Sequence, residues 1–363
     1  MIRLIDADLL CTRIFDVADT IDLESSRKLI SGAQMRRLSL RREGSEFIQL
    51  SDPPLLVDLG PRTLVVGGQP REVKLSAALF HHGAISLSVR VPVAKGSTLD
   101  ELTPVADELY DSKPLDALAT EEVTKLRKLL APHFEAAHLW DQNEGYTTIF
   151  VRALEGAPTA EQVLAAPGLA RLLLGEKEAL SAAEEREVLA HHFSYTPSDL
   201  AIVEWNAAFL YEPSGSEDIV DLLEIANAQL LELRYYDTVL DAELARMYDV
   251  VGRQRSSIFF SPYKRLAREL MQTLIELSEF IERVENSLKI VGDVYLARVY
   301  EAALTELRVT RWTEQVTRKH RLLQQTYSLL KSETDTVRAL TLETMVVVLI
   351  LFEIVMAMFR AGH

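Results

Sequence analysis

Apolar residues in the first two hundred positions recur with the short period of strands, interrupted by helix-length runs. Residues 12–18 and 146–154 are β-favouring runs, and residues 199–211 close the region with further strand signals. The clearest hairpin joins residues 72–80 to residues 84–93. One side of its second strand is apolar at every other position, namely Ile85, Leu87, Val89 and Val91. This pattern predicts an α+β domain over residues 1–213, in which helices accompany an N-terminal antiparallel or mixed sheet.

Helix starts in this region are marked by capping-box sequences. In each of them a hydroxyl side chain precedes a Glu or Gln by three residues, so that each side chain can bond the other's backbone N–H. The pairs are Thr98 with Glu101, Thr159 with Gln162, and Ser181 with Glu184. Thr120 precedes two glutamates, which suit the positive end of a helix. We therefore expect helices to begin near residues 98, 120, 159 and 181.

A second region begins after the turn residues 213–216. Residues 216–251 contain neither glycine nor proline, and apolar residues recur there at alternating spacings of three and four, as in a coiled-coil heptad. The predicted seam includes Leu223, Leu230, Leu233, Asp237, Leu240 and Leu244. Asp237 is a polar residue in an apolar seam, and such a residue typically sets the register of helix packing, an interpretation we prefer to a catalytic one.

Two more helical runs follow. Residues 263–291 lack breakers, and residues 293–361 continue without glycine or proline. The two shorter runs can pack only against the first half of the third. The pattern therefore predicts a long antiparallel helical hairpin, or three-helix coiled-coil unit, over residues 214–339.

The last apolar run, residues 340–359, is about 30 Å long as a helix, which matches the thickness of a hydrocarbon core. It includes Leu340, Met345, Val347, Leu349, Leu351, Glu353, Val355 and Phe359. Its Leu, Ile, Val and Phe residues contribute roughly −4 to −7 kcal/mol to insertion, and Glu353 opposes insertion by up to about 3.5 kcal/mol. We predict a C-terminal transmembrane helix, a tail anchor over residues 340–360. The alternative is an apolar helix buried in a soluble oligomer.

Charge predicts which side of the membrane holds the bulk of the chain. The basic residues upstream of the anchor outnumber Arg360 downstream, and they are Arg318, Lys319, Arg321, Lys331 and Arg338. The positive-inside bias therefore predicts a single-pass membrane protein with most of the chain in the cytoplasm. The net charge of −15 opposes attraction to phosphates, so no direct nucleic-acid binding is expected. Cys11 is the single cysteine, which excludes a disulfide within one chain.

Candidate chemistry is sparse. His81 and His82 fall at the hairpin tip, and adjacent strand residues point to opposite faces, so the pair could not share a metal without a bend. Trp140 and Trp205 are interpreted as core aromatics. The chain has no phosphate-binding loop, zinc-protease motif or nucleophile elbow. We therefore predict no catalytic, cofactor-binding or metal-binding residues.

Several segments resemble one known family. The helical segment 222–244 reads LLEIANAQLLELRYYDTVLDAEL, it follows DLAIVEWNAAFLY at 199–211, and LTLETMVVVLILFEIV stands at 340–355. Together they are similar to the "required for meiotic nuclear division" (RMD/RMND) family, whose shared domain has no assigned activity. The hairpin LFHHGAISLSVRVP at 79–92 is similar as well, although its histidine pair departs from the family's acidic and aromatic pair. The resemblance implies an α+β domain, a helical hairpin and one C-terminal membrane segment.

These observations favour a non-enzymatic, membrane-tethered scaffold or organiser. Its partners would be the lipid bilayer, further copies of the chain in a homo-oligomer, and an unidentified protein. The ribosome is a partner suggested by the resemblance, because mitochondrial members of that family are associated with organellar translation. Two alternatives stay open: a membrane-proximal enzyme that uses the N-terminal domain, and a soluble coiled-coil assembly factor.

Overall fold

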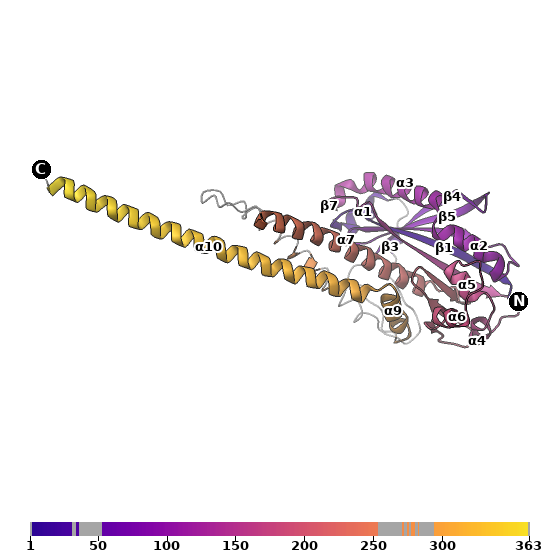
Figure 1. Cartoon of the computed structure of the whole chain (residues 1–363). Helices are drawn as coiled ribbons and strands as arrows, with labels where there is room; N and C mark the ends of the chain where they lie inside the picture. Colours follow the sequence, from indigo (N-terminus) through magenta and orange to yellow (C-terminus); the bar gives the residue numbers. More distant parts are fainter. Residues whose placement is uncertain are drawn as a thin grey trace. The chain divides into compact units, whose positions relative to one another are not determined.

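The structure is a computed structural model, and it describes residues 2–30, 34–35, 53–252, 271, 274–275, 277–279, 282 and 294–361 (Figure 1). The strands are β1 (Leu4–Asp16), β2 (Thr20–Ile21), β3 (Gln34–Met35), β4 (Leu55–Val66), β5 (Gln69–Leu79), β6 (Ala84–Pro92), β7 (Phe134–Glu135), β8 (Asn143–Leu154), β9 (His192–Phe193), β10 (Leu200–Val203) and β11 (Ala207–Tyr211). The helices are α1 (Leu23–Leu29), α2 (Leu99–Tyr110), α3 (Lys113–Leu130), the 3₁₀ turn η1 (Ala131–His133), α4 (Ala160–Leu164), α5 (Leu169–Leu174), α6 (Ala182–Val188), α7 (Asp218–Gly252), α9 (Val294–Glu306) and α10 (Val309–Ala361).

A mixed sheet organises the N-terminal region. Its strand order is β3-β4-β5-β6-β1-β8-β11-β10-β9. The central strand β1 is antiparallel to both β6 and β8, whereas β11 is parallel to β8. The predicted α+β class with a mixed sheet and helices is therefore confirmed. The predicted hairpin is also present as β5 and β6, which pair in register around the turn at residues 80–83.

Strand β1 is longer than the sequence pattern predicts. The β-favouring run begins at residue 12, but the strand begins at Leu4 and includes Asp6 and Asp8. Aspartate is unfavourable in strands, which explains why the early part was missed. Along β1 the side chains alternate between the two sheet faces: Leu9 and Cys11 belong to the larger apolar core, and Leu10 lies on the opposite face.

Three of the four predicted helix starts are confirmed. Thr98 and Thr159 form complete capping boxes, and the Ser181 side chain accepts from the Glu184 backbone N–H. The fourth prediction, a start at Thr120, is wrong. Helix α3 begins earlier, with Ser112 as its N-cap, and the Thr120 hydroxyl donates to the Asp116 carbonyl within the helix. The Thr120 hydroxyl therefore bonds to the preceding turn of α3, and Thr120 does not cap the start of a helix.

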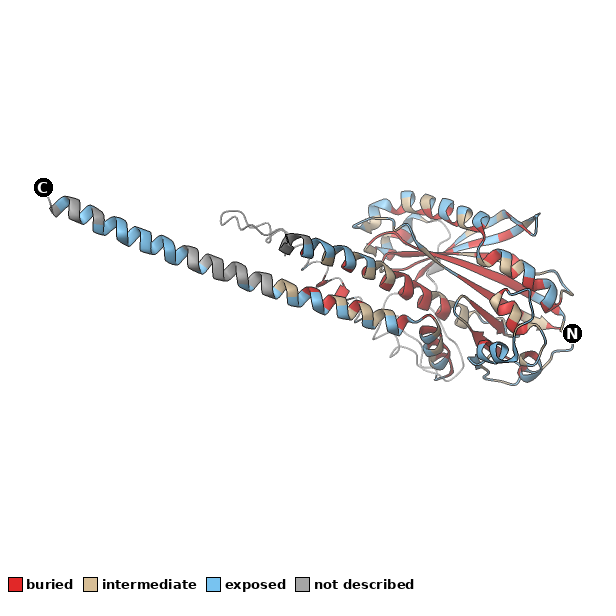
Figure 2. Cartoon of the chain, viewed as in Figure 1, coloured by how far each residue is buried: buried red, intermediate tan, exposed pale blue. Residues whose placement is uncertain are grey.

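Helices cover both faces of the sheet. Residues of α2, α3 and α5 contribute to the larger apolar core on one face. On the other face, Ile219 and Val220 of α7 pack against Leu10, Phe150 and Leu210. Figure 2 shows the central strands and the first part of α7 as mostly buried. A helix that is buried nearly all round belongs to a protein core, and this part of α7 fits that description.

The chain divides into two compact units. The first contains Met1–Tyr235 and Arg283–Trp312, and the second contains Tyr236–Glu282 and Thr313–His363. Helix α7 contributes to both. Of the predicted seam residues, Leu223, Leu230 and Leu233 are buried in the first unit, and the rest belong to the second. The predicted domain boundaries after residues 213 and 339 stay predictions.

In the second unit, Asp237 of α7 lies opposite α10. Its carboxylate is 2.7 Å from Lys319 Nζ and accepts from Gln315 at 3.1 Å. Asp241, one turn later, also pairs with Lys319, and the two helices run in the same direction here (Figure 1). Leu240 is buried and Leu244 is half-buried. The antiparallel partner predicted over residues 263–291 lies mostly outside the described residues.

The C-terminal part of α10 exposes its apolar side chains. Met345, Val347, Leu349, Leu351 and Glu353 are all exposed (Figure 2). The side chains of Leu340, Val355 and Phe359 lie outside the described residues. Across the described residues, no helix meets the combined length and apolarity of a membrane span, so the predicted transmembrane helix is not supported by the structure.

Candidate functional site

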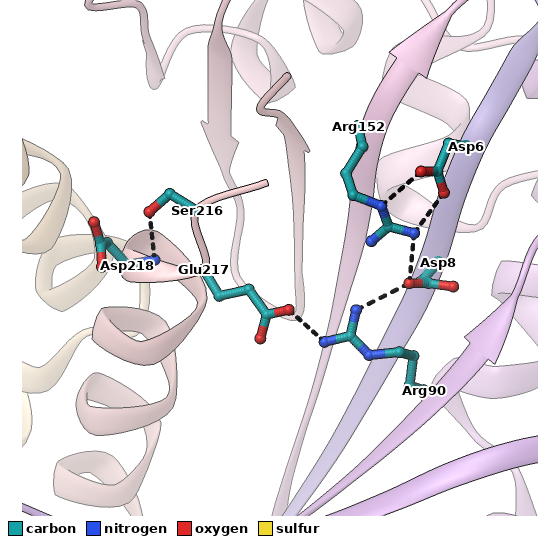
Figure 3. Close-up of polar contacts among 7 residues, drawn as sticks. All are labelled: Asp6, Asp8, Arg90, Arg152, Ser216, Glu217 and Asp218. Carbon is teal, nitrogen blue, oxygen red and sulfur yellow. Dashed lines mark hydrogen bonds and ion pairs between the residues drawn. The ribbon is translucent and has the colours of Figure 1, made fainter. Parts of the chain in front are cut away.

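A chain of alternating acidic and guanidinium side chains crosses the α7 face of the sheet (Figure 3). Arg152 of β8 donates to the two carboxylate oxygens of Asp6 at 3.0 and 2.6 Å, and to Asp8 at 2.9 Å. Arg90 of β6 donates to the same Asp8 oxygen, Oδ2, at 2.9 Å. Its other terminal nitrogen donates to Glu217 at 2.6 Å. The chain of charges therefore links three neighbouring strands to the residue that precedes α7.

Strand register brings these side chains together. Asp6 and Asp8 are two residues apart on β1, so they share a face of the sheet. In the neighbouring strands Leu10 pairs with Arg90, and Asp8 pairs with Phe150, two residues before Arg152. A shift of one residue in either pairing would turn the arginine to the opposite face.

The two arginines and Asp6 favour their charged forms in the ion-pair chain. A hydrogen bond from Arg152 lowers the pKa of Asp6. Burial alone would lower the pKa of Arg90, but Glu217 and Asp8 outweigh it and raise that pKa. Arginine is charged throughout the physiological range in any case. We therefore assign this cluster to the attachment of α7 to the sheet, and not to acid–base chemistry.

A second polar cluster lies at the other end of β1, around His138. Its Nε2 is 3.0 Å from Asp16 Oδ1, and its Nδ1 is 3.1 Å from the carbonyl oxygen of Ala136 and 3.6 Å from Asp19. The imidazole ring stacks on the Tyr235 ring of α7, with centroids 4.8 Å apart and planes 5° from parallel. This cluster therefore joins β1, the segment before β8, and α7.

Local backbone pairing explains how His138 reaches Asp16. The His138 N–H donates to the Val17 carbonyl at 2.9 Å, and the Trp140 N–H donates to the Asp16 carbonyl at 3.2 Å. The segment thus runs along the end of β1 as a short extension of strand pairing. Arg127 of α3 donates to the His138 carbonyl at 2.7 Å and holds the segment from the helix side.

The two partners of this pair both bind protons more tightly than usual. Burial alone would lower the pKa of His138, but its hydrogen bond to Asp16 and the charge of Asp16 outweigh it, so that pKa is raised. Burial raises the pKa of Asp16, and His138 opposes only part of that shift. Burial also raises the pKa of Asp19. The cluster therefore retains a proton to higher pH than its separate groups would.

The hairpin-tip histidines do not lie open to solvent. His81 Nδ1 is 3.1 Å from the carbonyl oxygen of Ile21, and His82 Nε2 is 3.5 Å from the buried carboxylate of Glu232 on α7. The two rings thus meet different partners, in agreement with their adjacency in a strand hairpin. Sequence reasoning found His81 and His82 but missed Glu232, which reaches His82 only through the packing of α7.

The two tryptophans interpreted as core residues have different surroundings. Trp205 is 46% exposed, with the Arg308 guanidinium 5.2 Å above its ring, so the core interpretation is wrong for it. Trp140 is partly exposed and meets the Tyr235 ring edge-on. Arg234 lies over Trp140 and pairs with Glu144. Within the described part of the chain, no three His, Cys, Asp or Glu side chains form a group that could hold a metal ion.

Comparison with known proteins places this architecture in a family. Residues 6–217 match the family model described as "Uncharacterized protein MJ0711, N-terminal domain". The chain belongs to the MJ0711 N-terminal domain family. The match begins at Asp6 and ends at Glu217, the two ends of the ion-pair chain, and it also contains Asp16 and His138.

Among relatives in this family is the uncharacterized protein MJ0711 of Methanocaldococcus jannaschii, which is 27% identical over 191 residues. The aligned part covers 52% of this chain and 58% of that protein, so the chain spans less than two thirds of its relative. No solved structure matches significantly. These comparisons support a domain of unknown function. They do not confirm membership of the RMD/RMND family, which stays a proposal.

Proposed function

We propose that this protein is a non-enzymatic scaffold that holds the MJ0711 N-terminal domain at a membrane through the C-terminal part of α10. The proposal includes an organiser role like that of RMD/RMND proteins, with most of the chain on the cytoplasmic side. The observation that carries it is the run of exposed apolar side chains between Leu342 and Met356, each between 47 and 64% exposed.

The distribution of these side chains around the helix favours lipid over a protein partner. Val346, Val347, Val348 and Leu349 are consecutive, and each is more than half exposed. Four consecutive positions point in every direction around a helix, whereas a coiled-coil partner needs a stripe on one side. Covering the eleven large apolar side chains of the run would contribute on the order of 10 kcal/mol, since each is about half exposed.

Glu353 opposes insertion, because a carboxylate costs up to about 3.5 kcal/mol near the centre of a membrane helix. It lies towards the far end of the run and is followed by Arg360 in the last turn. The remaining apolar gain exceeds that cost. The basic residues upstream of the run keep the bulk of the chain on the cytoplasmic side by the positive-inside bias.

The enzymatic alternative has less geometric support. Both ring nitrogens of His138 face acceptors, so neither can serve as a general base without breaking a contact. His82 with Glu232 is the pair that an enzymatic hypothesis would use. The soluble assembly factor predicts the same exposed run but requires that copies of the chain cover it.

Membrane fractionation of the full chain distinguishes these proposals. We expect the full chain to sediment with membranes and to resist extraction by high salt and carbonate, and a chain stopped at Ala339 to become soluble. The variant Leu349→Arg/Leu351→Arg should behave like the truncated chain. Leu129→Arg, at a leucine on α3 that is 48% exposed, is the control and should stay with membranes.

A full-length chain that stays in the aqueous fraction as a defined oligomer would overturn the membrane proposal. If truncation at Ala339 then reduced that oligomer to monomers, the result would support the soluble assembly factor in place of the membrane-tethered scaffold. A pull-down with the full chain in detergent, scored for protein and ribosomal RNA, tests the organiser role separately.

A further inference from the structure

Tyr235 is the last residue of α7 in the sheet unit, because the boundary between the two compact units falls between Tyr235 and Tyr236. A contact with the Tyr235 ring therefore holds this part of α7 within the sheet unit. The ring of His138 is stacked on it, 4.8 Å away and nearly parallel. The stacking partner is thus a titratable ring, and its charge state bears directly on the contact.

Both nitrogens of the His138 ring face groups that accept hydrogen bonds. The Ala136 carbonyl lies at Nδ1, and the Asp16 carboxylate lies at Nε2. A neutral imidazole carries a single N–H, whereas the imidazolium carries two. One proton must therefore be shared between Nε2 and Asp16 for both contacts to be hydrogen bonds. If that proton is lost, the neutral ring keeps a single N–H. One ring nitrogen then presents a lone pair to an acceptor, either the Asp16 carboxylate or the Ala136 carbonyl, and one of the two hydrogen bonds is lost.

Protonation also strengthens the contact with α7. A cation over an aromatic face is attracted by the ring quadrupole, and the imidazolium lies flat against the Tyr235 phenol. The neighbouring Arg234 is held by Glu144 and Gln142, so this part of α7 also has a contact with the sheet unit that does not involve His138.

We propose that His138 and Asp16 form a proton-dependent clamp on Tyr235: while the pair shares its proton, residues 230–235 of α7 are held against the sheet, and loss of that proton releases them. The acidic groups that face the His138 ring are Asp16 on β1 and Asp19 before β2, with Glu135 of β7 acting on Asp19. Arg127 on α3 donates to the His138 backbone carbonyl, and Arg234 on α7 lies over Trp140. The acidic groups favour the protonated ring.

The direction of the pH effect follows from the pair. The pKa of His138 is raised above its usual value of 6.5, so its stabilising contribution is fully present below about pH 6.5 and is lost as pH rises through the folded-state pKa. Asp16 and Asp19 also have raised pKa values, and they act in the same direction at lower pH. Release is therefore expected above pH 6.5, as the pH rises through the folded-state pKa of His138.

Backbone hydrogen exchange of the full chain, measured from pH 6 to pH 9 and corrected for the intrinsic exchange rate, tests the clamp. We expect protection of residues 230–235 to fall by about tenfold across this range, the change that loss of one charge-assisted hydrogen bond produces. Protection in the middle of β1 should stay constant. In His138→Gln the protection of residues 230–235 should be low and independent of pH. His192→Gln, an exposed histidine on β9, should retain the wild-type transition.

A second variant keeps the test decisive if His138→Gln does not fold. Tyr235→Leu removes the stacked ring and leaves the His138–Asp16 pair in place. The exchange of residues 230–235 should then lose its pH dependence, while the His138 ring still titrates in a histidine-labelled NMR spectrum. Wild-type protection that does not change while His138 titrates would overturn the clamp, as would a pH transition that persists in either variant.

Discussion

Replacing Asp8 with asparagine tests whether the buried centre of the ion-pair chain stabilises the sheet unit. Asp8 Oδ2 accepts from both Arg90 and Arg152, each at 2.9 Å, and its side chain is 9% exposed. An asparagine side chain at this position has nearly the same shape but no charge. Asp6 provides a matched control, because it lies on the same strand and face, also accepts from Arg152, and is 53% exposed.

The expected magnitude follows from the number and burial of the lost contacts. Two hydrogen bonds between charged groups stabilise by roughly 3–6 kcal/mol in total when fully desolvated. The amide oxygen of asparagine still accepts, and both arginines keep another carboxylate, so about half of that is lost. We expect Asp8→Asn to lower the free energy of unfolding by about 2–3 kcal/mol. Asp6→Asn should cost no more than about 1 kcal/mol, because an exposed ion pair contributes little.

Urea unfolding followed by tryptophan fluorescence measures this difference. Trp140, Trp205 and Trp312 all belong to the sheet unit, so the signal reports on that unit. With a slope of about 2–3 kcal/mol per M, the Asp8→Asn midpoint should fall by about 1 M. Equal midpoints for the two variants would refute the reasoning, because burial would then not decide the strength of these pairs. Lower stability of Asp6→Asn than of Asp8→Asn would refute it as well.

Two further predictions concern single positions in the sheet unit. Gly83→Ala should destabilise the unit severely, by about 3 kcal/mol or more, because φ is +94° and the added Cβ would meet the Ala18 carbonyl oxygen at 1.6 Å. Gly68→Ala is the control, because φ is +69° there but the new methyl group meets open space, and it should cost only about 1 kcal/mol. Equal thermal unfolding midpoints for Gly83→Ala and Gly68→Ala would contradict this explanation. Cys11 is fully buried, and burial raises the pKa of its thiol to about 11, so iodoacetamide should not label the native chain at pH 8 but should label it once in 6 M guanidinium. Labelling of the folded chain at the rate of a free thiol, followed by mass spectrometry, would show that this strand opens.

Features that depend on near neighbours along the chain can be predicted from the sequence alone. The β5–β6 hairpin follows from alternation around His81, His82 and Gly83, and the capping boxes at Thr98 and Thr159 need only a partner three residues away. Asp237 interrupts the predicted apolar seam and pairs with Lys319 of α10, and its role in setting the register stays a prediction. These are short-range patterns, for which residue type and spacing are sufficient information.

The places where the charged groups meet depend on the folded arrangement of the chain. Arg90 and Glu217 are 127 residues apart, and His138 and Asp16 are 122 apart. No local pattern encodes such pairs, because they depend on the order of strands and on which face α7 covers. The alternating aspartates at positions 6 and 8 are the signal that could have indicated the extended β1, but their low strand propensity concealed it. In the folded chain the ion pairs with Arg90 and Arg152 offset the low strand propensity of the aspartates. Burial strengthens the hydrogen bonds of both clusters, because the local dielectric constant is low, and both clusters contact α7 or the residue before it.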